Sequence, residues 1–281
     1  MKIISDIGST KSEWAWIKED GSVKRMSEIG FNPNYQSSDE IARVVQNILQ
    51  QTDYTSSTEI YIYGAGIDSP KSIENLLKAL AKLSISESKI HINSDLLAAA
   101  QAAYGRESGL IAILGTGSNI SYYDGEKLTP TNSLGYVLAD EGGGVDLGKS
   151  LLKAFIYNQL STTITQELKR DFQLSKESII HSIYFKKYPQ KYLASFAPFI
   201  AKHKENEKIQ ELIFTCFDTF FKGPASVFKD LSQQVKLIGS IGVHFQEHLQ
   251  ASAFHNGFEI TDCIQKPMDN LVKFHNEDKG K

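Results

Sequence analysis

One pattern constrains the fold more than any other because it occurs twice: a largely apolar strand, a turn of glycine and small polar residues, and a second strand. The first copy spans residues 2–17 and the second spans residues 109–125, with the turns at 8–12 and 115–118. Both turns supply more hydrogen-bond donors than a chain reversal needs. The surplus indicates an anion, and the repetition is typical of a duplicated nucleotide-binding architecture.

Helices and strands alternate after the first copy. A strand near 22–29 completes a meander, and the periodicity then predicts helix, strand, helix, strand and helix, beginning near residues 38, 59, 69, 89 and 95. Helices dominate residues 143–222, before a strand at 235–242 and another helix. The fold class is therefore α/β, with a domain boundary expected at residues 105–109.

Composition excludes several classes of protein. The chain has 281 residues, 41% hydrophobic and 22% charged, which argues against disorder, and its net charge of −3 predicts no nucleic-acid or membrane partner. Cys216 and Cys263 lie far apart without neighbouring ligands, so we expect inert core thiols and neither zinc nor an iron–sulfur cluster. A strand starting at Met1 and the lack of a stretch of ~20 apolar residues predict a cytoplasmic protein.

The second turn holds the first candidate site residues. Gly115 and Gly117 let backbone N–H groups approach a bulky anion, while Thr116 and Ser118 add hydroxyl donors. A tight hairpin with solvent-facing hydroxyls explains the same residues equally well. Neither turn is a P-loop, because the pattern Gly-x-x-x-x-Gly-Lys-Ser/Thr is missing from both.

Two carboxylates lie near the ends of predicted strands in the first half. Asp6 precedes the first turn, with Lys11 inside that turn, so Asp6 either anchors Mg²⁺ through water or accepts N–H groups of the turn. Asp95 follows a strand and opens a helix. Its carboxylate either stabilises the helix start or takes a proton from an attacking hydroxyl group.

Two glycine-rich segments lie in the second half. Residues 135–144 combine Asp140 and Glu141 with three consecutive glycines before a helix. Such a segment can offer backbone N–H groups to an anion and carboxylates to sugar hydroxyls, or its glycines can merely permit close packing. We favour the interpretation as a binding segment. Residues 239–242, GSIG, would let a flat ring approach the backbone.

Taken in order, these blocks resemble the BadF/BadG/BcrA/BcrD ATPase family. Within it, the chain is similar to the N-acetylglucosamine kinase group of the sugar kinase, Hsp70 and actin superfamily. The matching segments are DIGSTKS at 6–12, YGAG at 63–66, NSD at 93–95, LGTGSN at 114–119, GYVLADEG at 135–142 and IGSIG at 238–242.

The resemblance implies two ribonuclease H-like, actin-like ATPase domains, at residues 1–107 and 108–281, that face an interdomain cleft, with the last helix packed back on the first domain. It implies ATP and Mg²⁺ as cofactors, Asp95 as the catalytic base and Asp6 as a ligand of Mg²⁺ through water. By the same resemblance, ATP would be bound by Gly8, Ser9, Thr10, Lys11, Gly115, Gly117, Ser118, Gly239 and Ser240. The sugar would be bound by Asn34, Thr116, Gly135 and Asp140, and the protein would be a homodimer.

The function that this resemblance implies is transfer of the γ-phosphate of ATP to a hydroxyl of an amino sugar, foremost N-acetylglucosamine. Two alternatives stay open: an ATPase that changes the conformation of a protein partner, and a sensor that binds without turnover. Residues 134–136, LGY, replace a GWGH segment of the animal kinases, which leaves the acceptor sugar open. The cysteine clusters of the dehydratase activators and of the zinc-containing ROK kinases are missing.

Overall fold

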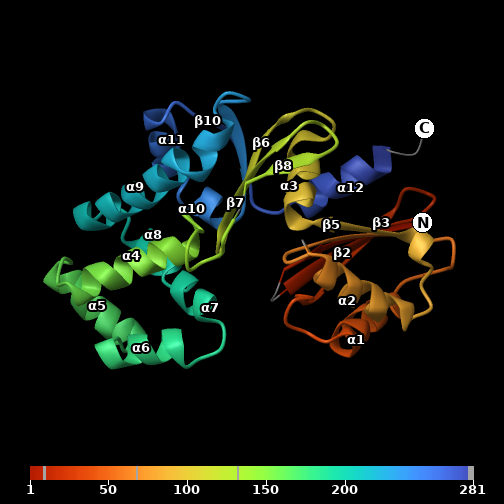
Figure 1. Cartoon of the computed structure of the whole chain (residues 1–281), viewed down its shortest axis with the longest axis horizontal. Helices are drawn as coiled ribbons and strands as arrows, with labels where there is room; N and C mark the ends of the chain where they lie inside the picture. Colours follow the sequence, from red (N-terminus) through yellow and green to blue (C-terminus); the bar gives the residue numbers. More distant parts are fainter. Residues whose placement is uncertain (9–10, 68, 132, 278–281) are drawn as a thin grey trace. The chain divides into compact units, whose positions relative to one another are not determined.

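The computed structural model (Figure 1) describes residues 1–8, 11–67, 69–131 and 133–277. Contacts between residues divide the chain into two compact units, each described here by itself. Unit 1 comprises Met1–Glu107, Gly125–Lys127 and Lys266–Lys281, and unit 2 comprises Ser108–Asp124 and Leu128–Gln265.

Unit 1 is built on a five-stranded sheet with the order β3-β2-β1-β4-β5. The first three strands form an antiparallel meander, whereas β4 runs parallel to β1 and β5 runs parallel to β4. The strands are β1 (Lys2–Ile7), β2 (Lys11–Ile17), β3 (Val23–Ile29), β4 (Glu59–Gly64) and β5 (Ile90–Ser94).

Helices cover both faces of this sheet. Ile3, Ile7 and Trp14 point to one face, where they form a core with α1 (Ser38–Leu49) and α2 (Pro70–Ala81). The other face packs against α3 (Asp95–Tyr104) and α12 (Met268–Glu277). The short 3₁₀ helix η1 (Glu87–Lys89) precedes β5.

The C-terminal helix α12 packs on unit 1, so unit 2 is shorter than the expected second domain, residues 108–281. His275 of α12 is buried, and its carbonyl accepts a hydrogen bond from Lys2 Nζ at 2.9 Å. Its Nε2 lies 2.9 Å from the hydroxyl of Tyr63 on β4. These contacts explain why the chain returns to unit 1, while the division into domains itself stays a prediction.

Unit 2 repeats the strand order of unit 1. Its sheet has the order β10-β9-β6-β7-β8, with an antiparallel meander β6-β7-β8 and with β9 parallel to β6 and β10 parallel to β9. The strands are β6 (Gly109–Leu114), β7 (Ser118–Tyr123), β8 (Leu128–Pro130), β9 (Gln234–Ile238) and β10 (Glu259–Ile264). The predicted α/β class with two ribonuclease H-like sheets is confirmed.

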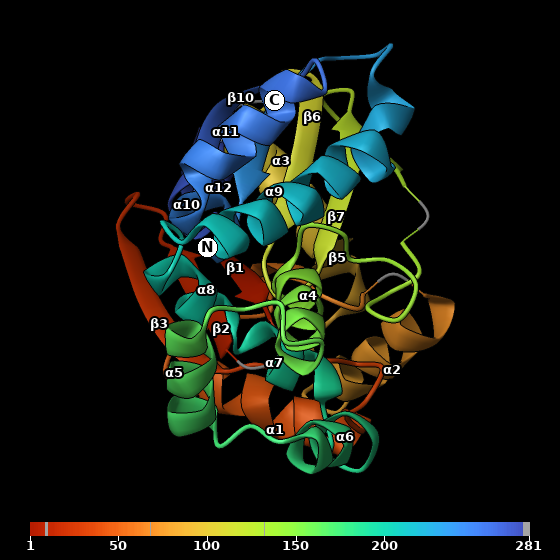
Figure 2. The same cartoon turned by 90° about the vertical axis from the view of Figure 1, so that its left-hand side faces the viewer.

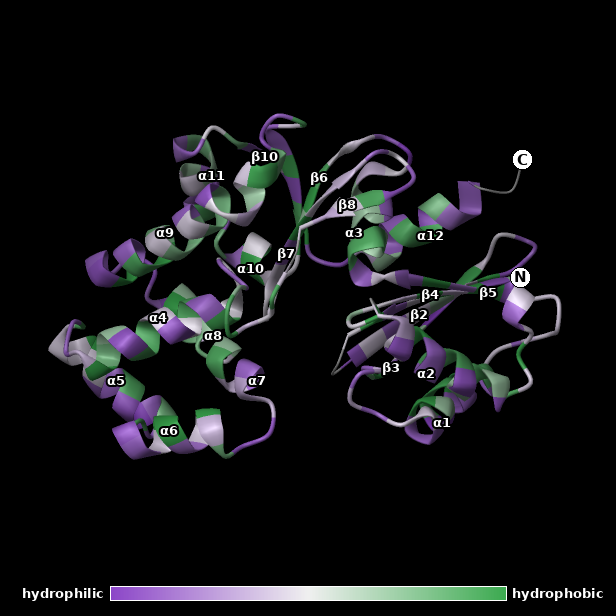
Figure 3. Cartoon of the chain, in the orientation of Figure 1, coloured by the Kyte–Doolittle hydropathy of each residue, from purple (hydrophilic) through white to green (hydrophobic). Residues whose placement is uncertain are grey.

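A large helical insertion separates β8 from β9 in unit 2 (Figures 1 and 2). Its helices at 144–156, 162–172 and 207–222 combine hydrophobic and hydrophilic residues (Figure 3), as amphipathic helices do, and two more helices follow β9. The elements are α4 (Gly144–Ile156), α5 (Thr162–Phe172), α6 (Lys176–Tyr184), α7 (Pro189–Ala194), α8 (Ala197–Lys202), α9 (Glu207–Lys222), η2 (Pro224–Phe228), α10 (Ser240–His244) and α11 (Gln246–His255). Among the helices that the structure describes, none combines the length and apolar character of a membrane span.

Candidate functional site

Asp6 lies near the end of β1 in unit 1, in one row of the sheet with its neighbours on the adjacent strands. It pairs with Glu13 on β2 and with Tyr63 on β4, so the three side chains share a face. Burial, followed by the charges of Asp95 and Glu13, raises the pKa of Asp6 from 3.8 to about 6. Asp6 therefore lies where the negative charges of Asp95 and Glu13 disfavour its ionisation.

Asp95 is the first residue of α3, directly after β5. The hydroxyl of Ser94 accepts the N–H of Leu97 at 3.2 Å and so provides the side-chain cap of this helix. Ser94 thus fills the capping role that the sequence allowed for Asp95. What distinguishes Asp95 is that its charge, after burial, raises the pKa of Asp6, because interacting carboxylates at strand ends are suited to proton transfer.

The turn after β1 is held by backbone contacts. The N–H of Gly8 donates to the carbonyl of Lys11 at 3.0 Å, and a Cβ atom on Gly30 would come within 1.9 Å of the Gly8 oxygen. Gly30 therefore has to be glycine for the turn to lie against the end of β3. Gly30 is not predicted from the sequence, because a single glycine before Phe31 forms no recognisable motif. The predicted phosphate ligands Ser9 and Thr10 lie outside the described residues.

Asn34 lies exposed in a loop of unit 1 that the YGAG segment holds in place. Its side chain donates to the carbonyl of Gly66 at 2.9 Å. Gly66 has a φ of +75°, and a Cβ atom there would come within 2.7 Å of the Asn32 side chain and 2.8 Å of that of Asn34. The segment thus positions the Asn34 loop.

The turn after β6 in unit 2 is clamped by the start of α4. The N–H groups of Gly144 and Val145 donate to the carbonyls of Gly115 and Thr116, at 2.8 and 2.9 Å. The N–H groups of Thr116 and Gly117 donate to no acceptor within the described part of the chain. These two amides, together with the Ser118 hydroxyl, are the donors that an anion could use.

The expected anion site at the three consecutive glycines is wrong. The N–H of Gly142 donates to Asp146 Oδ2 at 3.0 Å, and the N–H of Gly143 donates to the carbonyl of Asp140 at 3.1 Å. With Gly144 and Val145 bonded as described above, this helix start has its amides engaged within unit 2. The glycines serve close packing instead, since a Cβ atom on Gly143 would lie 2.6 Å from Gly117.

Asp140 has the strongest local signature of a functional residue in unit 2. Its φ of +68° is in the left-handed region, which costs a residue with a side chain about 1–3 kcal/mol. Its Oδ1 accepts the N–H of Ser118 at 3.2 Å, and a Cβ atom on Gly117 would lie 2.6 Å from that oxygen. Burial raises the pKa of Asp140 despite the hydrogen bond from Ser118.

Two cavities of unit 2 adjoin this turn. One, of about 380 Å³, is largely apolar and is lined by Gly115, Thr116, Ser240 and residues of α7, α8 and α10. The other, of about 460 Å³, is lined by Ser118, Asp140, the 133–141 segment and the end of α9. Thr116 therefore lies with Ser240, in the first cavity, and Ser118 lies with Asp140, in the second.

The remaining predicted residues have conformational roles in unit 2. Gly239 has a φ of +118°, and a Cβ atom there would come within 2.3 Å of the Leu114 oxygen, so this glycine lets the ends of β9 and β6 approach each other. Gly135 has a φ of +71°, and its carbonyl accepts the N–H of Ala139 at 2.8 Å in the turn before Asp140.

The two cysteines match their prediction as unreactive thiols. Cys216 is buried and its Sγ lies 3.3 Å from the hydroxyl of Ser150. Burial raises the pKa of Cys216 to about 12 and also raises the pKa of the partly buried Cys263. Both thiols are therefore protonated near neutral pH.

Comparison with known proteins places these features in a family. No family model matches the chain, and no curated protein matches it. Its structure superposes on that of a "putative N-acetylglucosamine kinase" from Porphyromonas gingivalis with a TM-score of 0.90, at 31% identity over 99% of both chains. A protein of the same description from Chromobacterium violaceum matches with a TM-score of 0.74 at 14% identity, over 97% of this chain and 98% of that one.

A further match shows the fold alone. The ROK family glucokinase of Streptomyces griseus, solved with glucose and AMPPNP, superposes with a TM-score of 0.54 at 11% identity over 97% of both chains. The Porphyromonas gingivalis relative is similar in sequence as well as in structure, across nearly its whole length. The chain therefore belongs to the N-acetylglucosamine kinase-like family of this relative.

Proposed function

We propose that this protein is an ATP-dependent kinase that phosphorylates a hydroxyl group of an amino sugar, with N-acetylglucosamine as the foremost acceptor. The observation that carries the proposal is the placement of Asp6 and Asp95 at strand ends of unit 1, where burial and then the charge of Asp95 raise the pKa of Asp6. The description of the Porphyromonas gingivalis relative supports the choice of acceptor.

Asp95 would act as the general base in this reaction. It accepts the proton of the attacking sugar hydroxyl as the oxygen bonds to the γ-phosphorus of ATP and the bond to ADP breaks. Such assistance contributes roughly 10²- to 10⁴-fold in rate. Because phosphoryl transfer needs little covalent chemistry from the protein, alignment and charge neutralisation supply most of the remainder.

Mg²⁺ fits the carboxylates of unit 1. Asp6 offers a hard oxygen ligand, and a divalent cation would offset the burial and the charge of Asp95 that raise the pKa of Asp6. Since Mg²⁺ keeps several waters, a single carboxylate that contacts the ion through water is sufficient. Asp6 would hold the ion, which when bound neutralises charge on the phosphates.

The turn after β6 and the two cavities of unit 2 suggest separate binding roles for phosphate, nucleoside and sugar. The amides of Thr116 and Gly117 and the Ser118 hydroxyl would bind phosphate oxygens, as would Gly8, Ser9, Thr10 and Lys11 of unit 1. Thr116, expected to bind the sugar, lines the cavity with Ser240, so we propose phosphate for its amide instead. The apolar cavity with Ser240 suits a nucleoside, and Gly239 shapes the backbone beside it. The cavity with Asp140 suits a sugar, because a partly buried carboxylate can accept hydrogen bonds from sugar hydroxyl groups, and Gly135 of the same unit would complete these contacts. Asn34 of unit 1 stays a proposed sugar ligand.

The test is ATP consumption by the purified protein with N-acetylglucosamine, N-acetylmuramic acid, glucosamine, glucose or no sugar. We expect turnover that depends on one amino sugar and that Asp95→Asn reduces by at least about 10²-fold. Asp39→Asn is the matched control, because Asp39 also lies in the first turn of a helix but is exposed and paired with Lys82. ATP hydrolysis at the same rate with and without sugar would favour the ATPase that acts on a protein partner. Binding of ATP or sugar without any turnover would favour the sensor.

The cellular location and the oligomeric state are two further expectations that accompany this function. A kinase that consumes ATP and a free sugar works in the cytoplasm, where ATP is supplied. The expected homodimer remains a prediction, which the molar mass of the full chain in solution tests by light scattering.

A further inference from the structure

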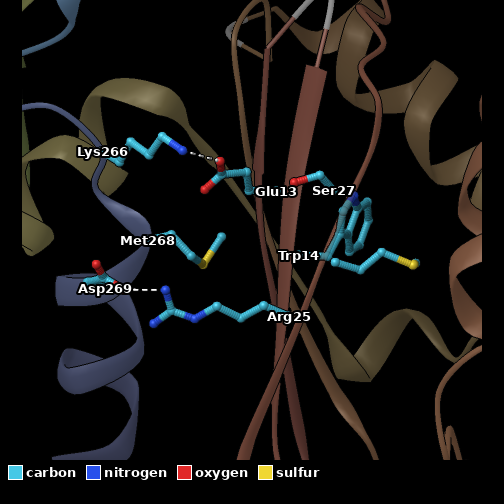
Figure 4. Close-up of a pocket in the computed structure, with 8 residues that line it drawn as sticks. Glu13, Trp14, Arg25, Ser27, Lys266, Met268 and Asp269 are labelled. Atoms are coloured by element: carbon cyan, nitrogen blue, oxygen red, sulfur yellow. Dashed lines mark hydrogen bonds and ion pairs between the residues drawn. The ribbon is translucent and has the colours of Figure 1, made fainter.

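Glu13 of unit 1 is shared by two lysines. Its Oε1 lies 3.4 Å from Lys11 Nζ and 3.1 Å from Lys266 Nζ. Figure 4 shows Lys266 extending to Glu13 from the segment that precedes α12. Lys11 lies at the first turn, whereas Lys266 is 253 residues beyond Glu13 in sequence, so only the fold brings the two cations to one carboxylate oxygen.

The position of Glu13 gives this arrangement a consequence for phosphate binding. Glu13 pairs across the sheet with Asp6 and adds to the repulsion there. A phosphate that binds Lys11 removes one of the two cations that neutralise Glu13. Without Lys266, Glu13 would hold Lys11 more strongly, and breaking that ion pair would be a cost that opposes nucleotide binding.

A second ion pair offers an internal comparison. Arg25 of β3 pairs with Asp269 of α12 and lines the same cavity, of about 340 Å³, as Glu13 and Lys266. Figure 4 shows the two pairs bridging the strands and the α12 segment at separate places. Both pairs tie the same two parts of unit 1 together, but only Glu13 also contacts a lysine of the phosphate turn.

We propose that Lys266 is a positioning residue for nucleotide binding: it keeps Glu13 neutralised, so that Lys11 is released to the phosphates of ATP. Lys266 does not contact the nucleotide in this mechanism. The inference rests on the proposed function only in requiring that ATP bind beside Lys11.

The test is the Kd of the full-length protein for MgATP, measured by calorimetry. We expect Lys266→Met to raise the Kd about three- to tenfold, as loss of a partly exposed ion pair implies. Lys266→Arg restores the pair and Asp269→Asn removes the other one, so both should bind as the wild type does. Thermal melting of each variant reports whether it is folded.

The double variant separates this mechanism from a direct contact. In Glu13→Gln no carboxylate competes for Lys11, so adding Lys266→Met should leave the Kd unchanged. If Lys266→Met weakens MgATP binding equally in the wild type and in Glu13→Gln, Lys266 contacts the phosphates directly, and the proposal is overturned. Equal binding by Lys266→Met and Asp269→Asn would also overturn it. A wild-type protein that binds no ATP would refute the proposed function as well.

Discussion

The two units share a strand order but carry different chemistry at matching positions. The pairs that close the two hairpins are Ile7 with Ser12 in unit 1 and Leu114 with Ser118 in unit 2. One residue earlier stands Asp6 in unit 1 and Ile113 in unit 2. The duplicated scaffold therefore repeats a turn, whereas the titratable carboxylate at the strand end belongs to unit 1 alone.

The connections differ as well. Unit 1 joins its third and fourth strands through α1, whereas unit 2 inserts α4 to α9 at the same place. Asp140 comes from the segment that leads into this insertion and reaches the turn only because Gly117 has no side chain. Unit 1 thus presents acids from strand ends, and unit 2 presents one from a connection. The proposed function assigns catalysis to the acids of the first unit and sugar binding to that of the second.

The largest effects should separate those two roles. Asp95→Asn should lower kcat by roughly 10²- to 10⁴-fold with little change in the KM for sugar. Asp140→Asn should chiefly raise the KM for sugar, by about 10- to 100-fold, because it weakens binding in the ground state and transition state alike. Steady-state kinetics with varied sugar concentration measures both parameters. A KM effect in Asp95→Asn together with a kcat effect in Asp140→Asn would reverse the catalytic and binding roles of the two residues.

A pH-dependent effect on stability should distinguish Asp6 from its unit 2 counterpart, the uncharged Ile113. Because the pKa of Asp6 is raised from 3.8 to about 6 in the folded protein, its favourable contribution is complete below pH 3.8 and is lost as the pH rises through about 6. Asp6→Asn should therefore stabilise the protein at pH 7.5 by up to about 3 kcal/mol. Chemical denaturation in EDTA should show this gain vanishing near pH 4, and a gain that persists there would contradict the raised pKa.

The two turns should be comparably sensitive to a single methyl group. Gly30→Ala places a Cβ atom 1.9 Å from the Gly8 oxygen, and Gly143→Ala places one 2.6 Å from Gly117. Each should destabilise the protein by about 1–3 kcal/mol through overpacking. Hydrogen exchange should show the loss of protection starting in the unit that carries the change. Unaltered exchange in either variant would show that the turn concerned adapts.

The smallest effect should come from the cap of α3. Ser94→Ala should cost about 1 kcal/mol of stability, since it removes the hydrogen bond from the N–H of Leu97. Because Asp95 remains, turnover should fall far less than in Asp95→Asn. Thermal melting and kinetics on one preparation check both expectations, and an equal loss of turnover would return Asp95 to a structural role.

Local patterns determined much of this fold. The alternation of apolar and polar residues marks both hairpins, and helical periodicity marks α1 and α2, because each signal lies within a few consecutive residues. The strands β8 and β10 lack such a signal, since β8 has three residues and β10 is an edge strand with several exposed positions. Neither strand is predicted from the sequence.

What the sequence by itself determined about the candidate site is its list of residue types near strand ends: Asp6, Asp95 and the two glycine-rich turns. The tertiary structure alone decided their partners. Gly30 lies against Gly8, and the backbone amides of residues 142–145 donate hydrogen bonds within unit 2. Lys266, near the C-terminal end of the sequence, forms an ion pair with Glu13. The reason is physical: such contacts join residues that are distant in sequence, so their geometry leaves no periodic trace in either segment.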